Sequence, residues 1–253
     1  MPKRGLTARG DGESIPTPAA IRNPGHPGKL RSMLAALALV PLVLASADAY
    51  GGSVFVDPPT TAVRLTSEAV TFTVGKRSVS VEARYMFKNT TSNELSLLIG
   101  IPLVAENTNR AFGSNRFDRL SATWDKESLV FAAAPMAADI NPEATSYVKP
   151  YVATAVFKPN ATHVLRVQLE YPIGKDDLHR FLAWRTAGAA SWAGTVERAD
   201  YSFKFNTDTV FHIIKIEPNW GWQWGTTGAY TKRTNFEPSA NETIRFRYYP
   251  SDF

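Results

Sequence analysis

The stretch SVSVEARYMFKNTTSNELSLLIGIPL, residues 78–103, decides the fold class. In its first half apolar side chains occupy every second position from Val79 to Phe87, with Ser, Glu, Arg, Met and Lys between them. Successive side chains of a β-strand point to opposite faces of the sheet. The period of two therefore predicts a strand with one buried face and one solvated face.

The second half of the stretch predicts another strand, because Leu and Ile occupy alternate positions from Leu95 to Leu103. The segment between the two halves, residues 88–94, reads KNTTSNE. Asn, Thr and Ser favour turns, since their side chains bond to nearby backbone and Asn tolerates a positive φ. The stretch is thus predicted to form an antiparallel hairpin.

The same analysis extends along the chain. Residues 151–157 and 162–171 form a second predicted hairpin around the turn Lys158-Pro159-Asn160. Residues 226–241 are predicted to be a polar loop. Further strands are predicted around 54–56, 63–65, 70–74, 119–124, 129–131, 180–185, 200–205, 210–216 and 244–249. Short strands without a long amphipathic helix after the leader predict an all-β fold, an antiparallel β-sandwich in one domain spanning residues 50–253.

The first 49 residues have a different composition. Residues 1–28 are rich in Pro, Gly, Thr and Arg without hydrophobic periodicity, which predicts a disordered N-terminal extension. Residues 29–49 combine basic residues, an apolar run and a final Ala-Asp-Ala, which is typical of a signal peptide cleaved before Tyr50. The apolar run is too short for a spanning helix, so no integral membrane span is expected in the mature chain. Either Met1 or Met33 is the start of the protein.

The net charge and the absence of cysteine exclude some classes of function. The formal net charge of the whole chain is +5, but six Lys and Arg against three Asp and Glu precede Tyr50. Most of the basicity therefore leaves with the leader, which argues against a nucleic-acid partner. The chain contains no cysteine, so disulfides and thiol chemistry are excluded. The expected location is periplasmic or secreted.

Aromatic residues supply the candidate ligand-binding site. Trp220, Trp222 and Trp224 alternate in NWGWQWG, and an extended backbone would place their indoles on one face about 6.7 Å apart. Such a row could stack on sugar rings, and Trp192 joins it as a fourth candidate. The alternative is that these rings cover one end of the core, with Gly221 and Gly225 bending the chain.

Motifs for catalysis or metal binding are not recognised. His163, His179 and His212 show no paired ligand spacing, and the calcium-loop pattern that begins at Asp139 has Ala144 where Gly is required. Neither a G-x-S-x-G motif nor a P-loop occurs. No metal, no cofactor and no catalytic residue is therefore predicted, and the protein is not expected to be an enzyme.

Residues 50–103 contain the segments YGGSVFV and VRLTSEAVTFTV and then a V-x-V-x-Y-x-F-x-N strand that precedes G-I-P. These segments resemble strands of exported bacterial proteins grouped as a domain of unknown function. Later segments of that group are similar to two further stretches of this chain, FKPNATHVLRVQLEYPIG and TAGAASWAGTVERADYSF. In the second stretch Ala187 is inserted. The resemblance implies a β-rich exported domain and assigns no activity.

These observations lead to three hypotheses about function. The first is a binding protein of the bacterial cell envelope that takes a polysaccharide or an envelope protein as its ligand. The second is a structural or assembly component of the envelope. The third is a hydrolase without a recognisable motif, whose carboxylates meet only in space.

Overall fold

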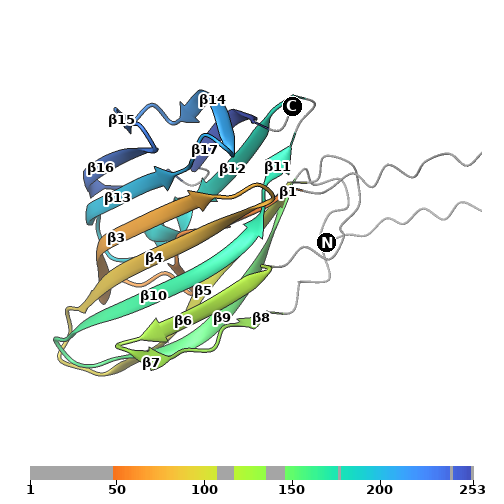
Figure 1. Ribbon diagram of the computed structural model, residues 1–253. Coiled ribbons are helices and arrows are strands. Elements are labelled where there is room, and N and C mark those ends of the chain that lie inside the picture. The colour runs from red at the N-terminus through yellow and green to blue at the C-terminus, as the bar shows by residue number, and fades with distance from the viewer. Residues whose placement is uncertain (1–47, 107–116, 135–145, 176–177, 240–241, 252–253) are drawn as a thin grey trace, which may run out of the picture. The chain divides into compact units, whose positions relative to one another are not determined.

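The computed structural model describes residues 48–106, 117–134, 146–175, 178–239 and 242–251, and it confirms the predicted β-sandwich. Two sheets pack face to face (Figure 1). Most neighbouring strands are antiparallel, but two pairs in the described residues, β1 with β12 and β3 with β13, are parallel. The sheets are therefore mixed. Among the described residues we find no helix with the length and hydrophobicity needed to span a bilayer.

The first sheet has nine strands. Its main order is β14 (Val210–Glu217), β17 (Thr243–Pro250), β12 (Arg180–Arg185), β1 (Asp48–Gly52), β5 (Leu95–Glu106), β9 (Ser146–Phe157) and β8 (Ala132–Ala133). The short strands β11 (Gly174–Lys175) and β2 (Phe55–Val56) pair with β12 and β5. β1 begins two residues before the predicted domain boundary at Tyr50.

The second sheet has eight strands. Their order is β15 (Gln223–Gly225), β16 (Gly228–Phe236), β13 (Val196–Lys204), β3 (Val63–Val74), β4 (Ser78–Asn89), β10 (Thr162–Pro172), β6 (Arg119–Trp124) and β7 (Glu127–Ser128). A 3-10 helix, η1 (Ala187–Ser191), follows β12.

Both predicted hairpins were wrong, although their four strands exist. β4 pairs with β3 and β10 in the second sheet, whereas β5 pairs with β1, β2 and β9 in the first. β9 and β10 are separated in the same way. Each turn therefore crosses from one sheet to the other, since each pair of strands contributes buried faces to opposite sides of the same core.

Asn89 fixes the first crossing. Its side chain is fully buried, and its Nδ2 donates to the backbone oxygens of Phe157 at 3.1 Å and Asn93 at 2.8 Å. Its Oδ1 accepts from the backbone N–H of Thr91 at 2.9 Å. One amide group thus joins the end of β4 to the loop and to β9 in the other sheet.

Asn89→Asp is expected to destabilise the protein by about 2 kcal/mol or more, because a carboxylate cannot donate and would be buried. Urea unfolding at neutral pH measures the loss. Asn93→Asp, at an exposed position of the same loop, is the matched control and should change the free energy of unfolding by less than about 0.5 kcal/mol. Equal effects at both positions would contradict the role of Asn89.

The predicted loop 226–241 was also wrong, since it contains β16. β16 pairs along its length with β13, and its buried positions include Ala229 and Thr231. Small and polar residues at inward positions give a weak hydrophobic alternation, which explains why the pattern did not reveal the strand.

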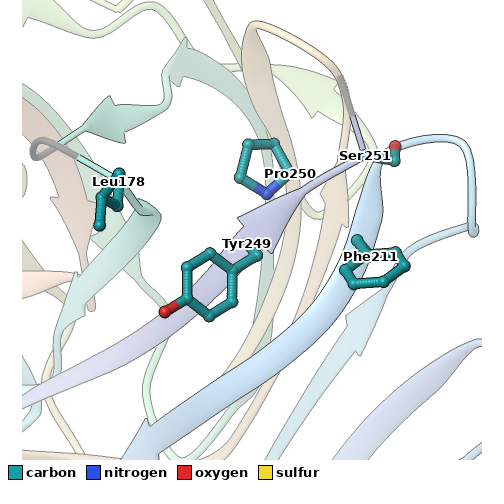
Figure 2. Close-up of a pocket in the computed structure, with 5 residues that line it drawn as sticks. All are labelled: Leu178, Phe211, Tyr249, Pro250 and Ser251. Atoms are coloured by element: carbon teal, nitrogen blue, oxygen red, sulfur yellow. The ribbon is translucent and has the colours of Figure 1, made fainter. Parts of the chain in front are cut away.

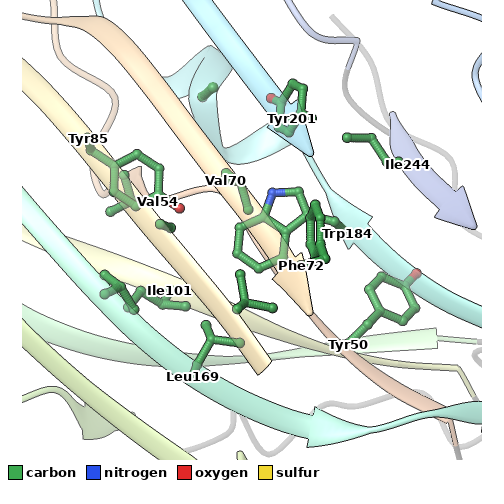
Figure 3. Close-up of a cluster of buried hydrophobic side chains, with 14 of the residues drawn as sticks. Tyr50, Val54, Val70, Phe72, Tyr85, Ile101, Leu169, Trp184, Tyr201 and Ile244 are labelled. Atoms are coloured by element: carbon green, nitrogen blue, oxygen red, sulfur yellow. The ribbon is translucent and has the colours of Figure 1, made fainter. Parts of the chain in front are cut away.

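Aromatic side chains fill the space between the sheets (Figure 3). The Phe72 ring stacks on Phe203 with centroids 4.7 Å apart and meets Trp184 edge-on at 5.5 Å. Phe203 in turn stacks on Phe246 at 5.0 Å. These contacts join β3 and β13 of one sheet to β12 and β17 of the other, so the inner faces of both sheets share one core.

Candidate functional site

The three tryptophans of NWGWQWG do not form an exposed row. Gly221 has a φ of +70°, which bends the backbone between the first two indoles. Trp222 is 9% exposed, and its Nε1 donates to the backbone oxygen of Pro218 at 2.9 Å. Its ring packs against Phe203 at 5.2 Å. Trp222 therefore belongs to the core.

Trp220 and Trp192 are also engaged by the protein. Trp220 is half-buried beside Trp222, with ring centroids 6.4 Å apart, and Arg233 lies over its ring at 5.5 Å. Trp192 is buried against Phe87 at 4.5 Å. Of the four candidates, Trp224 alone is well exposed, at 55%. The structure therefore leaves one of the four indoles available for stacking on a ligand.

A different group of apolar side chains surrounds a hollow on the surface. Figure 2 shows Leu178, Phe211, Tyr249, Pro250 and Ser251 around this hollow, which has a volume of about 520 Å³. Phe211 is 79% exposed and Leu178 is 56% exposed. Apolar side chains at such exposure, gathered at one place, are typical of a surface that another molecule covers. We call this group the apolar hollow.

Irregularity in β14 explains why Phe211 points outward. The register of β14 against β17 shifts twice. The first shift lies between Val210 and His212, and the second lies between Ile213 and Lys215. Phe211 lies at the first shift while Val210 is buried. A β-bulge adds a residue to one strand and redirects its side chains. In the sequence VFHIIKIE of β14, the apolar residues Val210 and Phe211 are adjacent, and so are Ile213 and Ile214. These pairs break the period of two, and this break is the sequence signal that could have indicated the site.

Charged side chains occupy the same two strands beside the apolar hollow. Arg245 and Arg247 share the parity of Tyr249 on β17 and lie opposite Glu217 and Lys215 of β14. The pKa of Glu217 is lowered, mainly by its hydrogen bond from Lys215 and further by the charges of Arg247 and Arg245. The surface next to the apolar hollow is therefore predominantly basic.

The histidines show ordinary structural contacts. His163 is buried, with its Nδ1 2.6 Å from Asp125 Oδ2, and its Nε2 accepts the backbone N–H of Lys158 at 2.9 Å. The Tyr249 ring lies 4.8 Å from His179. Within the described ranges, no group of three or more His, Asp or Glu side chains is arranged to hold a metal ion. The calcium-loop candidate at Asp139 lies outside the described residues.

Comparison with known proteins identifies the fold. No family model and no curated protein matches the sequence. A structure from Legionella pneumophila named "putative nutrient binding protein" is 13% identical, with a TM-score of 0.63, and the match covers 79% of this chain and 71% of that one. At this identity the likeness shows a shared fold alone.

Two enzymes show weaker structural similarity. An M1 zinc metallopeptidase from Deinococcus radiodurans is 9% identical with a TM-score of 0.36, and the match covers 75% of this chain and 43% of that one. Leukotriene A4 hydrolase from Saccharomyces cerevisiae is 10% identical with a TM-score of 0.39, and the match covers 74% and 29%. This chain spans less than half of either enzyme.

Proposed function

We propose that this protein is an exported, non-enzymatic binding protein of the bacterial cell envelope and that it takes a protein ligand at the apolar hollow. The observation that carries the proposal is the exposure of Phe211, Leu178 and Tyr249 around one concave surface. Covering apolar area gains roughly 25 cal/mol per Å², so an apolar side chain of a partner inserted there is stabilised. The name of the Legionella protein, whose fold this chain shares, is in keeping with a binding role.

The chemistry of the apolar hollow favours a protein partner over a sugar. Its lining offers the hydroxyl groups of Tyr249 and Ser251 but otherwise Leu, Phe and Pro carbon, whereas a sugar presents many hydroxyl groups that need partners when buried. The bulges in β14 also disfavour the addition of a partner strand along its edge. We therefore infer docking through side chains, with Arg245 and Arg247 favouring acidic residues beside the inserted apolar group.

Phe211→Ser is expected to weaken binding of an envelope protein at least about tenfold, since central aromatic residues dominate such interfaces. The tagged exported protein is incubated with envelope extract, the retained partner is identified and purified, and its affinity is measured by calorimetry. Phe211 is exposed, so the variant should melt at the wild-type temperature. Unchanged affinity would refute docking at the apolar hollow.

A carbohydrate ligand is the second candidate, and the exposure of Trp224 is the observation that favours it. Trp224→Ala serves as the matched variant in the same experiment. Binding of a polysaccharide that is lost in Trp224→Ala and kept in Phe211→Ser would establish this candidate instead of the first.

Export is tested separately by sequencing the N-terminus of the protein recovered from the envelope fraction. Cleavage after Ala49 gives a chain that starts at Tyr50. This cleavage removes the first two residues of β1, Asp48 and Ala49, which pair with Glu106 and Ala105 of β5. Recovery of an uncleaved chain from the cytoplasm would contradict the proposed location.

A further inference from the structure

Glu68 is a carboxylic acid inside the core of the sandwich. A register shift between Leu65 and Ser67 changes the parity of β3, so that Glu68 points inward together with Val70 and Phe72. Its side chain is fully buried, with 0% exposure. Carboxylates are almost never fully buried unless they are paired, so this position calls for a physical explanation.

Hydrogen bonds connect Glu68 to the opposite sheet. Ser53, in the segment between β1 and β2, donates its hydroxyl to Glu68 Oε1 at 2.5 Å. Trp184 of β12 donates its Nε1 to Ser53 Oγ at 3.2 Å. The backbone of Ser53 is held as well, since its N–H donates to Arg185 O at 2.8 Å. The carboxyl group on β3 is thereby tied to the β1–β2 segment, which is itself bonded to β12 of the nine-stranded sheet.

The second carboxyl oxygen has no such partner. Neither Glu68 Oε2 nor the Tyr201 hydroxyl has a hydrogen bond of normal geometry among the residues described. The titratable groups that face Glu68 are Tyr85 from β4 and Tyr201 from β13. The groups that face it from the other side, Ser53 of the β1–β2 segment and Trp184 of β12, are uncharged. Tyr85, Tyr201 and Trp184 appear around the same part of the core in Figure 3.

These surroundings favour the neutral acid. Burial raises the pKa of Glu68 from 4.5 to about 7, because the loss of hydration outweighs the favourable contacts from Ser53, Trp184 and Tyr201. The pKa values of Tyr85 and Tyr201 are raised as well, first by burial and then by the Glu68 charge, so both phenols stay neutral. A protonated Oε2 becomes a donor, and the adjacent Tyr201 oxygen can accept from it.

We propose that Glu68 is a proton-dependent clamp between the two sheets: the neutral acid tolerates burial with Ser53 and the β1–β2 segment held against β3, whereas loss of the proton leaves a charge without hydration in the core. The carboxylate accepts from Ser53 more strongly than the acid does, but the loss of hydration is the larger effect, so the charged state favours opening of the segment to water. The clamp responds to pH without any bound ligand. It lies in the interior and is independent of the apolar hollow.

Two measurements on the full chain test the clamp. Infrared or ¹³C NMR spectra of the carboxyl groups should show one acid that is still protonated at pH 6, absent from Glu68→Gln. Hydrogen exchange at the Ser53 amide, corrected for its intrinsic pH dependence, should become about tenfold faster between pH 6 and pH 8, and this acceleration should vanish in Glu68→Gln.

Glu82→Gln, at an exposed position of β4, is the control and should retain both signals. Full ionisation of every carboxyl group of the wild type at pH 6 would overturn the proposal, and this spectrum does not depend on the variant folding. Equal acceleration of exchange in wild type and Glu68→Gln would overturn it also.

Discussion

Trp184→Ala is expected to lower the free energy of unfolding by about 3–5 kcal/mol, the usual cost of deleting a buried indole. Trp184 is fully buried and meets Phe72 edge-on at 5.5 Å. A Cβ at Gly51 would lie 2.8 Å from its ring, so β1 packs directly on the indole. The deletion therefore opens a cavity between the sheets and also removes the donor to Ser53.

Denaturant titration followed by circular dichroism measures this loss. Trp224→Ala is the control, because that indole is 55% exposed, and it should change the free energy of unfolding by no more than about 0.5 kcal/mol. A decrease in the free energy of unfolding for Trp184→Ala that is no larger than the decrease for Trp224→Ala would show that Trp184 does not hold the sheets together.

The second large effect is a fall in stability with rising pH caused by Glu68. The pKa of this group in the folded protein, about 7, lies above its ordinary value of 4.5. The folded state therefore binds the proton more tightly, and its contribution is complete below pH 4.5 and is lost as the pH rises to about 7. The loss amounts to roughly 3 kcal/mol.

Glu68→Gln should remove this dependence, since a neutral amide has no proton to lose. At pH 8 the variant is expected to be more stable than the wild type by up to about 3 kcal/mol, with a much smaller difference at pH 4.5. Urea unfolding of both proteins at several pH values measures the difference. A difference that stays constant across this range would show that Glu68 has the same pKa folded and unfolded.

Local patterns predicted most of the strands because the alternation of side chains is a property of neighbouring residues. The run from Val79 to Phe87 corresponds to β4, and its buried positions are the alternate ones that the sequence indicates. The turn between Asn89 and Leu95 is also where the sequence predicts it. Turn residues show that the chain reverses, but they do not show which sheet the next strand joins.

The apolar hollow and the placement of the tryptophans depended on tertiary structure. Trp222 and Trp224 are two residues apart, yet the first packs on Phe203 and the second is exposed. Their difference arises from contacts with residues elsewhere in the fold, since Trp222 packs on Phe203 of β13 and donates to the backbone oxygen of Pro218. Leu178 and Phe211 are brought together by the pairing of β17 with both β12 and β14.

The sequence by itself determined that this chain forms β-strands around an apolar core without cysteine chemistry, because hydrophobic alternation and composition are local quantities. Glu68 shares the parity of Val70 and Phe72 in that pattern, but its burial among Ser53, Trp184 and Tyr201 is decided by tertiary structure. Strand pairing and the environment of a buried charge depend on contacts between distant residues, and those contacts exist only once both sheets have closed on the core.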